Sequence, residues 1–107
     1  MKKESKFQKE VIDDIMEMFP NAIIMKNDPT YIQGIPDLTI LNEDKWATLE
    51  TKRSRNEAHQ PNQDYYVETM NKMSFSSFIF PENKKEVLHA LAQSLKSTRR
   101  TRVSKSK

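Results

Sequence analysis

Two short apolar runs separated by a polar tetrapeptide constrain this chain more than any other feature of its sequence. The runs are DLTIL at 37–41 and WATLETK at 46–52, and NEDK at 42–45 lies between them. Short runs with this composition, bounded by turn-forming residues, are typical of strands, and a short polar connection between two of them is typical of a hairpin. The sequence therefore predicts an antiparallel pair of strands near the middle of the chain.

The segments on both sides of this hairpin alternate between helical and strand-like patterns. Apolar residues recur at helical spacing or form short strand-like runs, and the segments are helices at 5–19, 62–73 and from 83 onward, and strands at 22–26 and 74–80. The predicted order is αβββαβα. Because a helix separates the third strand from the fourth, those two strands can pair in parallel. The predicted fold class is α/β: a small mixed β-sheet flanked by helices.

Length and charge divide the chain into one domain and a tail. A chain of 107 residues, of which 36% are apolar, can bury one modest core, and we assign residues 1–96 to a single domain. Residues 1–93 carry twelve Lys or Arg against fifteen Asp or Glu, whereas residues 94–107 carry six basic side chains and no acidic one. A basic tail at 97–107 can hold a polyanion, although a merely disordered, soluble terminus has the same composition.

Several classes of protein are excluded or disfavoured by composition. The chain contains no cysteine, which excludes disulfides, thiolate zinc sites and cysteine nucleophiles, and its single glycine excludes a glycine-rich phosphate loop. No apolar run is long enough to span a membrane, and the N-terminal sequence MKKESKFQKE lacks the apolar segment of a signal peptide. We therefore expect a cytoplasmic protein without a membrane partner.

Charged residues at the ends of the two central strands form the first candidate site. Alternation along a strand places Glu50 and Lys52 on one face, and Asp37 begins the neighbouring strand, beside the end of the second. Two carboxylates at one edge of a sheet can bind Mg²⁺, and a lysine beside them can orient or deprotonate a bound water. From the pattern alone, the alternative is a cross-strand ion pair on an exposed sheet edge.

The sequence GIPD, followed by a hairpin and an apolar strand ending in ETK, resembles the PD-(D/E)xK nuclease superfamily, in particular the stand-alone VRR-NUC domains of phages and bacteria. The resemblance extends from the first predicted helix to the last and implies a restriction-endonuclease-like core. It implies that Gly34 is the gate glycine before Pro36–Asp37 and that Gln63 lies near the active site. It also implies that an acidic residue of the first helix joins the metal shell; Glu4 matches best and Glu10 is second.

The activity that this resemblance implies is Mg²⁺-dependent hydrolysis of phosphodiester bonds in DNA, with Mn²⁺ able to substitute. The implied metal ligands are Asp37, Glu50, the backbone carbonyl of Thr51, and Glu4. Lys52 would position the attacking water, and Gln63 would orient Lys52 or the phosphate. The expected protein is a homodimer that acts on branched DNA, like a Holliday-junction resolvase, in the cytoplasm of a bacterium or a phage-infected cell.

Two other functions remain as alternatives to a junction resolvase, and five arginines are predicted to contact DNA. One rival is a nickase, flap or restriction-type nuclease on the same fold, and the other is a DNA-binding module that does not cleave. Arg53 and Arg55 follow the motif directly and either contact DNA phosphates or are solvated loop charges. The remaining predicted DNA contacts lie in the tail: Arg99, Arg100 and Arg102.

Overall fold

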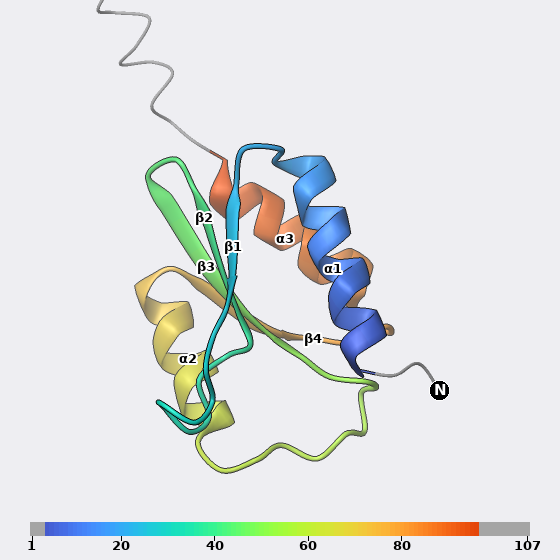
Figure 1. Ribbon diagram of the computed structural model, residues 1–107, viewed down its shortest axis with the longest axis vertical. Helices are drawn as coiled ribbons and strands as arrows, with labels where there is room; N and C mark the ends of the chain where they lie inside the picture. The colour runs from blue at the N-terminus through green and yellow to red at the C-terminus, as the bar shows by residue number, and fades with distance from the viewer. Residues whose placement is uncertain (1–3, 97–107) are drawn as a thin grey trace, which may run out of the picture.

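A computed structural model describes residues 4–96 of the chain (Figure 1). Its elements are α1 (Glu4–Met18), β1 (Ile23–Lys26), β2 (Leu38–Asn42), β3 (Lys45–Thr51), α2 (Gln63–Met73), β4 (Phe75–Ile79) and α3 (Lys84–Leu95). The predicted order and the α/β class are confirmed. The predicted basic tail at 97–107, with Arg99, Arg100 and Arg102, lies outside the described residues. No helix within 4–96 combines the length and the apolar character needed to cross a membrane.

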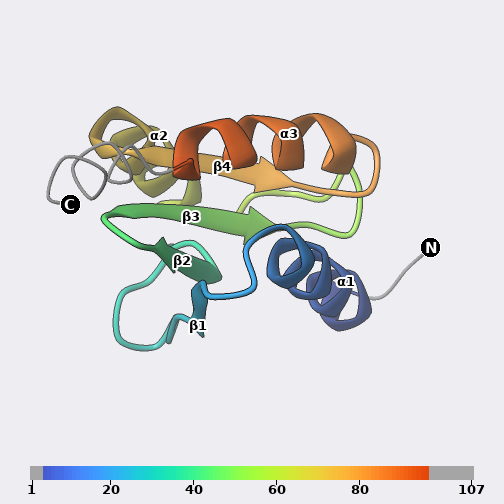
Figure 2. The ribbon, with the colours of Figure 1, turned by 90° about the horizontal axis from the view of Figure 1, so that it is seen from above.

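The four strands form one mixed sheet in the order β1-β2-β3-β4 (Figure 2). β1 pairs with β2 and β2 with β3 antiparallel, whereas β3 and β4 are parallel, as expected for strands joined by a helix. In the central hairpin Asn42 pairs with Lys45, so the turn itself contains two residues, and Glu43 adopts a positive φ of 57° there. Positive φ is what a tight hairpin turn requires, because it matches the twist of the strands.

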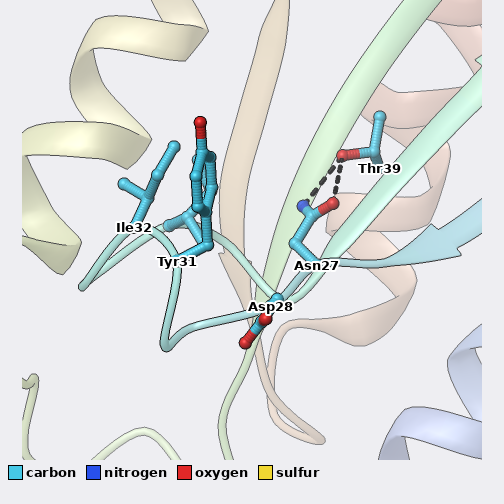
Figure 3. A pocket seen from close by; sticks show the side chains of 6 residues that line it. Asn27, Asp28, Tyr31, Ile32 and Thr39 are labelled. Carbon is cyan, nitrogen blue, oxygen red and sulfur yellow. Dashed lines mark hydrogen bonds between the residues drawn. The ribbon is translucent and has the colours of Figure 1, made fainter.

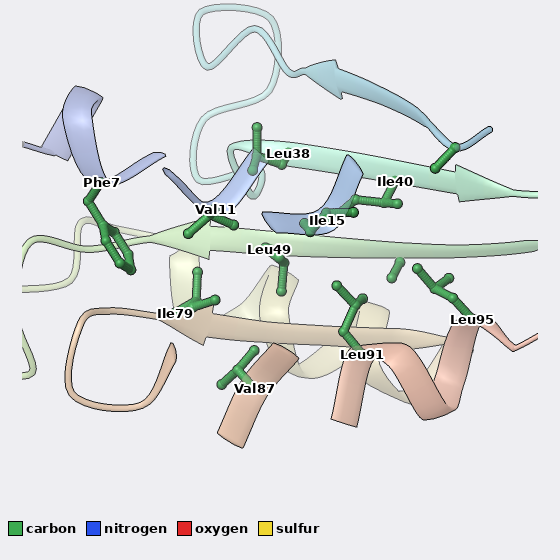
Figure 4. Close-up of a cluster of buried hydrophobic side chains, with 12 residues drawn as sticks. Phe7, Val11, Ile15, Leu38, Ile40, Leu49, Ile79, Val87, Leu91 and Leu95 are labelled. Carbon is green, nitrogen blue, oxygen red and sulfur yellow. The ribbon is translucent and has the colours of Figure 1, made fainter. Parts of the chain in front are cut away.

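One face of the sheet carries the apolar core. α1 and α3 lie on this side of the sheet and α2 on the other (Figure 1). Side chains from both helices and from three strands interlock there (Figure 4), and the largest fully buried ones include Phe7, Ile15, Leu38, Ile40, Leu49, Ile79, Leu91 and Leu95. Burial of apolar surface on this scale is the main term that stabilises the fold.

The opposite face of β3, beneath α2, is buried but polar. Thr48 donates a hydrogen bond from its hydroxyl to Ser76 on β4 (2.7 Å), and the side chains of Glu50 and Lys52 lie further along the same face. Among apolar residues of α2, only Val67 is buried. Strand β3 thus separates a hydrocarbon core from a layer of polar side chains, and every buried polar group in that layer needs a partner.

Candidate metal centre

The two predicted carboxylates lie side by side at one edge of the sheet. The β2–β3 register pairs Leu38 with Leu49, and extending it by one position sets Asp37 opposite Glu50. The Asp37 backbone N–H donates to Oε1 of Glu50 (3.1 Å). Oδ2 of Asp37 accepts from the backbone N–H (3.0 Å) and the hydroxyl (2.6 Å) of Thr51. Both carboxylates are therefore held in place by the hairpin itself.

Lys52 and Gln63 complete a buried network with Glu50. The Lys52 ammonium donates to Oε1 of Gln63 (2.7 Å) and to the carbonyl of Ala58 (3.1 Å), and it lies 4.0 Å from Oε2 of Glu50. Nε2 of Gln63 donates to Oε2 of Glu50 (2.8 Å). Glu50 is 2% exposed and Lys52 3%, so these side chains are not the solvated ion pair of an exposed edge. Gln63, the first residue of α2, bridges the acid and the amine.

The charge of Glu50 is only partly compensated by its surroundings. Burial and, after it, repulsion from Asp37 raise the pKa of Glu50 from its ordinary 4.5 to about 8. Lys52 and the Asp37 N–H oppose this shift without outweighing it. A divalent cation between the two carboxylates would remove their repulsion and favour the ionised form.

Glu4 approaches this centre together with a carboxylate that sequence reasoning missed, Glu57. Burial raises the pKa of Glu4, and the charges of Glu57 and Asp37 and a hydrogen bond with Glu57 raise it further. Oε1 of Glu57 accepts from the backbone N–H (2.5 Å) and Nε (3.4 Å) of Arg53. Glu57 lies in a segment whose sequence is typical of a polar linker. Nothing in the sequence pattern around Glu57 distinguishes it from a solvated residue.

The carboxylates suit Mg²⁺ better than metals that need several protein ligands. Within residues 4–96, no group of three or more His, Cys, Asp or Glu side chains is arranged to hold a metal ion, and a metal-binding role for Glu4 stays a prediction. Mg²⁺ is commonly held by one or two carboxylates and keeps several waters, whereas structural zinc takes four protein ligands. The mutually repelling pair of half-buried Asp37 and buried Glu50 fits such an ion. The role of the Thr51 carbonyl stays a prediction.

The single glycine of the chain joins the two halves of the site. Gly34 has a φ of +90°, in the left-handed region that favours glycine. A Cβ at this position would lie 2.6 Å from Cβ of Asn62 and 2.8 Å from the carbonyl oxygen of Pro61. The loop that leads to Asp37 thus touches the segment that leads to Gln63, and only glycine permits this approach.

The two arginines that follow β3 contact other parts of the protein. The Arg53 guanidinium pairs with Glu57, while the Arg55 guanidinium lies over the ring of Phe80, 5.6 Å from its centroid. The Arg55 backbone N–H donates to Glu82 (3.1 Å). These contacts hold the start of the segment between β3 and α2 in place. Phosphate contacts by Arg53 and Arg55 stay a prediction.

His59 fastens the same segment at its other end. Its ring stacks on Phe78, with centroids 4.1 Å apart and planes inclined by 17°, and Nδ1 lies 2.6 Å from Oδ1 of Asp64. Phe78 is the β4 partner of Glu50 in the sheet register. His59 thus holds the chain next to Ala58, whose carbonyl accepts from Lys52.

Comparison of this chain with protein-family models, curated proteins and solved structures gives no match.

Proposed function

We propose that this chain is a Mg²⁺-dependent DNA endonuclease. The observation that carries the proposal is the constellation at the end of the central hairpin: two adjacent carboxylates, Asp37 and Glu50, and a buried lysine that one glutamine ties to Glu50. A buried carboxyl with a pKa near 8 beside a second carboxylate is costly for a fold. Such perturbed groups concentrate at functional sites.

The proposed roles follow from the positions of the polar groups. Asp37 and Glu50 would hold the ion through their carboxylate oxygens. A bound Mg²⁺ would polarise the scissile phosphate and supply a water of lowered pKa. Lys52 carries its charge to the same edge of the sheet, where it can orient the attacking water and offset charge that develops on the phosphate. Gln63 positions Lys52, because its Oε1 accepts from the ammonium.

Branched DNA is the substrate we propose, cleaved by a homodimer that resembles a junction resolvase. The support is the likeness of GIPD and ETK to the VRR-NUC motif, together with the two-fold symmetry that a four-way junction offers to a dimer. Nicking, flap cleavage and restriction-type cleavage would use the same centre. A DNA-binding module that does not cleave would have no use for the Asp37–Glu50 pair.

A cleavage assay with an isosteric variant tests the proposal. Labelled four-way junction, flap, duplex and single-stranded DNA are incubated with the protein, with and without Mg²⁺ or Mn²⁺. We expect metal-dependent cleavage of the junction and its loss in Asp37→Asn, which keeps the size of the side chain but removes its charge. Asp13→Asn is the matched control, since Asp13 is exposed and pairs only locally with Lys9.

Binding separates the rival classes. Asp37→Asn should still bind DNA in a mobility-shift assay, because the substitution does not remove positive charge. Cleavage that persists in Asp37→Asn would refute the assigned centre. Metal-independent DNA binding by the wild-type protein with no cleavage of any of the four substrates would instead favour the non-cleaving module.

A further inference from the structure

A pocket of about 170 Å³ lies next to the candidate metal centre, between the loop 27–36 and the sheet (Figure 3). Its lining is mixed in character and consists of Asn27, Asp28, Tyr31, Ile32, Ile35 and Thr39. None of these side chains is used by the proposed metal chemistry. The pocket therefore calls for an explanation of its own.

Residues that line the pocket are bonded to, or close in sequence to, Asp37, one of the two carboxylates of the candidate metal centre. Thr39 is two residues beyond Asp37, so the two positions share a face of the sheet and lie about 7 Å apart. The Asn27 backbone N–H donates to the carbonyl of Asp37 (2.8 Å), and its Nδ2 donates to the carbonyl of Pro36 (2.8 Å). A group held in this pocket would therefore sit a short, fixed distance from the proposed ion.

One wall of the pocket is rigid and polar. The side chains of Asn27 and Thr39 hydrogen-bond to each other, with Nδ2 of Asn27 2.8 Å and Oδ1 of Asn27 3.1 Å from the Thr39 hydroxyl. The amide is thereby locked against the strand. Because its hydrogen bonds stay inside the protein, the wall offers a firm surface rather than a free donor or acceptor.

The opposite wall is an aromatic ring with little packing around it. Tyr31 is 83% exposed, yet its backbone is anchored because its N–H donates to the Asp28 carbonyl (3.2 Å). Figure 3 shows the ring nearly edge-on, across from Asn27 and Thr39. The Tyr31 ring and the wall formed by Asn27 and Thr39 lie on opposite sides of the pocket, and the space between them suits a flat ligand.

The charge of the pocket argues against a phosphate as its ligand. No basic residue among those at 4–96 lines it, and hydrogen bonds from the hydroxyl and N–H of Thr30 lower the pKa of Asp28, which therefore carries a negative charge at neutral pH. Oδ1 of Asp28 accepts both of these bonds (2.6 and 2.9 Å). Figure 3 shows this carboxylate directed away from the space between Tyr31 and Asn27, so it adds negative charge near the pocket rather than a contact inside it. A flat, uncharged ring matches these properties.

We propose that the pocket receives the base of the nucleotide next to the scissile phosphate, stacked on Tyr31. This inference rests on the proposed nuclease function and specifies its substrate. A base stacked and paired within a duplex cannot enter a side pocket, so the nucleotide must be unpaired or flipped out. The preferred substrate is then branched DNA that presents an unpaired or flipped base at the cut, such as a four-way junction opened at its branch point or a flap.

Fluorescence of 2-aminopurine tests this without any cleavage. The analogue replaces the unpaired base next to the branch of a flap substrate, and the protein is added in EDTA. We expect quenching on binding with the wild type and with Tyr31→Phe, which keeps the ring. Tyr31→Ala should abolish the quenching and weaken binding about five- to 150-fold, the range measured for base–aromatic stacking.

Tyr65→Ala is the matched control, because Tyr65 is an exposed tyrosine (62%) on α2 that does not line the pocket. It should leave the quenching at wild-type level. Quenching that survives Tyr31→Ala, or an equal loss in Tyr65→Ala, would overturn the proposal. Free 2-aminopurine deoxyriboside is a further arm: Tyr31-dependent quenching at the same concentration would assign the pocket to a free nucleoside and refute its role in DNA.

Failure here and failure of the nuclease function give different results. A protein that cleaves but shows no Tyr31-dependent quenching loses only the base pocket. A protein that shows the quenching but never cleaves with Mg²⁺ or Mn²⁺ keeps the pocket and loses the nuclease.

Discussion

As the pH rises, the variant Glu50→Gln should become more stable relative to the wild type. In the wild type the Glu50 pKa is raised from 4.5 to about 8, mainly by burial, so the folded state holds a proton that the unfolded state releases. The stability that this proton provides is complete below pH 4.5 and is lost progressively as the pH rises to about 8. Glutamine occupies nearly the same volume and does not ionise, so the variant lacks this loss.

The size of the effect follows from the shift. Within the window between the two pKa values, linkage lowers the wild-type free energy of unfolding by about 1.4 kcal/mol per pH unit. Between pH 6 and pH 9 the wild type should therefore lose about 2–3 kcal/mol relative to Glu50→Gln. For a domain of this size that corresponds to a relative change in Tm of about 10 °C.

Glutamine also brings a loss that does not depend on pH. Glu50 accepts hydrogen bonds on both oxygens, from the Asp37 N–H and from Nε2 of Gln63, and the NH₂ group of glutamine can accept neither. One unmade hydrogen bond lowers the stability of the variant by about 1–3 kcal/mol at every pH. The informative quantity is therefore the slope of the difference with pH and not its value at one pH.

Urea denaturation at half-unit steps from pH 5 to pH 9 measures this slope in wild type, Glu50→Gln and the control Glu68→Gln, whose side chain is exposed on α2. The Glu68 variant should parallel the wild type. Parallel curves for Glu50→Gln and wild type would refute the reasoning, since Glu50 would then ionise as it does in the unfolded chain. Mg²⁺ should stabilise the wild type, with a larger effect at pH 8 than at pH 6, and should stabilise Glu50→Gln much less.

Two further predictions concern other parts of the chain. Gly34→Ala should lower the free energy of unfolding by about 1–3 kcal/mol, because Gly34 has a positive φ and an added Cβ would overlap with Asn62 and Pro61. Thermal melts would check this, with Gln60→Ala at an exposed neighbouring loop position as the control. An unchanged Tm of Gly34→Ala would contradict the prediction. Removing residues 97–107 should weaken DNA binding and flatten its salt dependence by up to about 0.9 in log–log slope for each lost phosphate contact, while the cleavage positions stay the same; a mobility-shift titration in salt measures it, and an unchanged slope would leave the tail without a role in binding.

The fold was predictable because its elements carry strong periodicities. Alternation along 46–52 predicts that Glu50 and Lys52 share a face, and the turn predicts that Asp37 lies beside them; the register confirms both positions. Glu57 and His59 were not predictable as neighbours of the site. They lie in a loop without periodicity, and their contacts depend on side chains distant in sequence, among them Phe78.

The polar layer beneath α2 has a consequence for how the molecule opens. Because α2 buries little hydrocarbon, lifting it away from the sheet would expose few apolar atoms and leave the packing of α1 and α3 intact, at the cost of the hydrogen bonds between Gln63 and the pair Glu50 and Lys52. The free energy of local unfolding is smallest where few buried apolar contacts hold a segment in place. Amide hydrogens of α2 should therefore exchange through partial opening, well before those of β3.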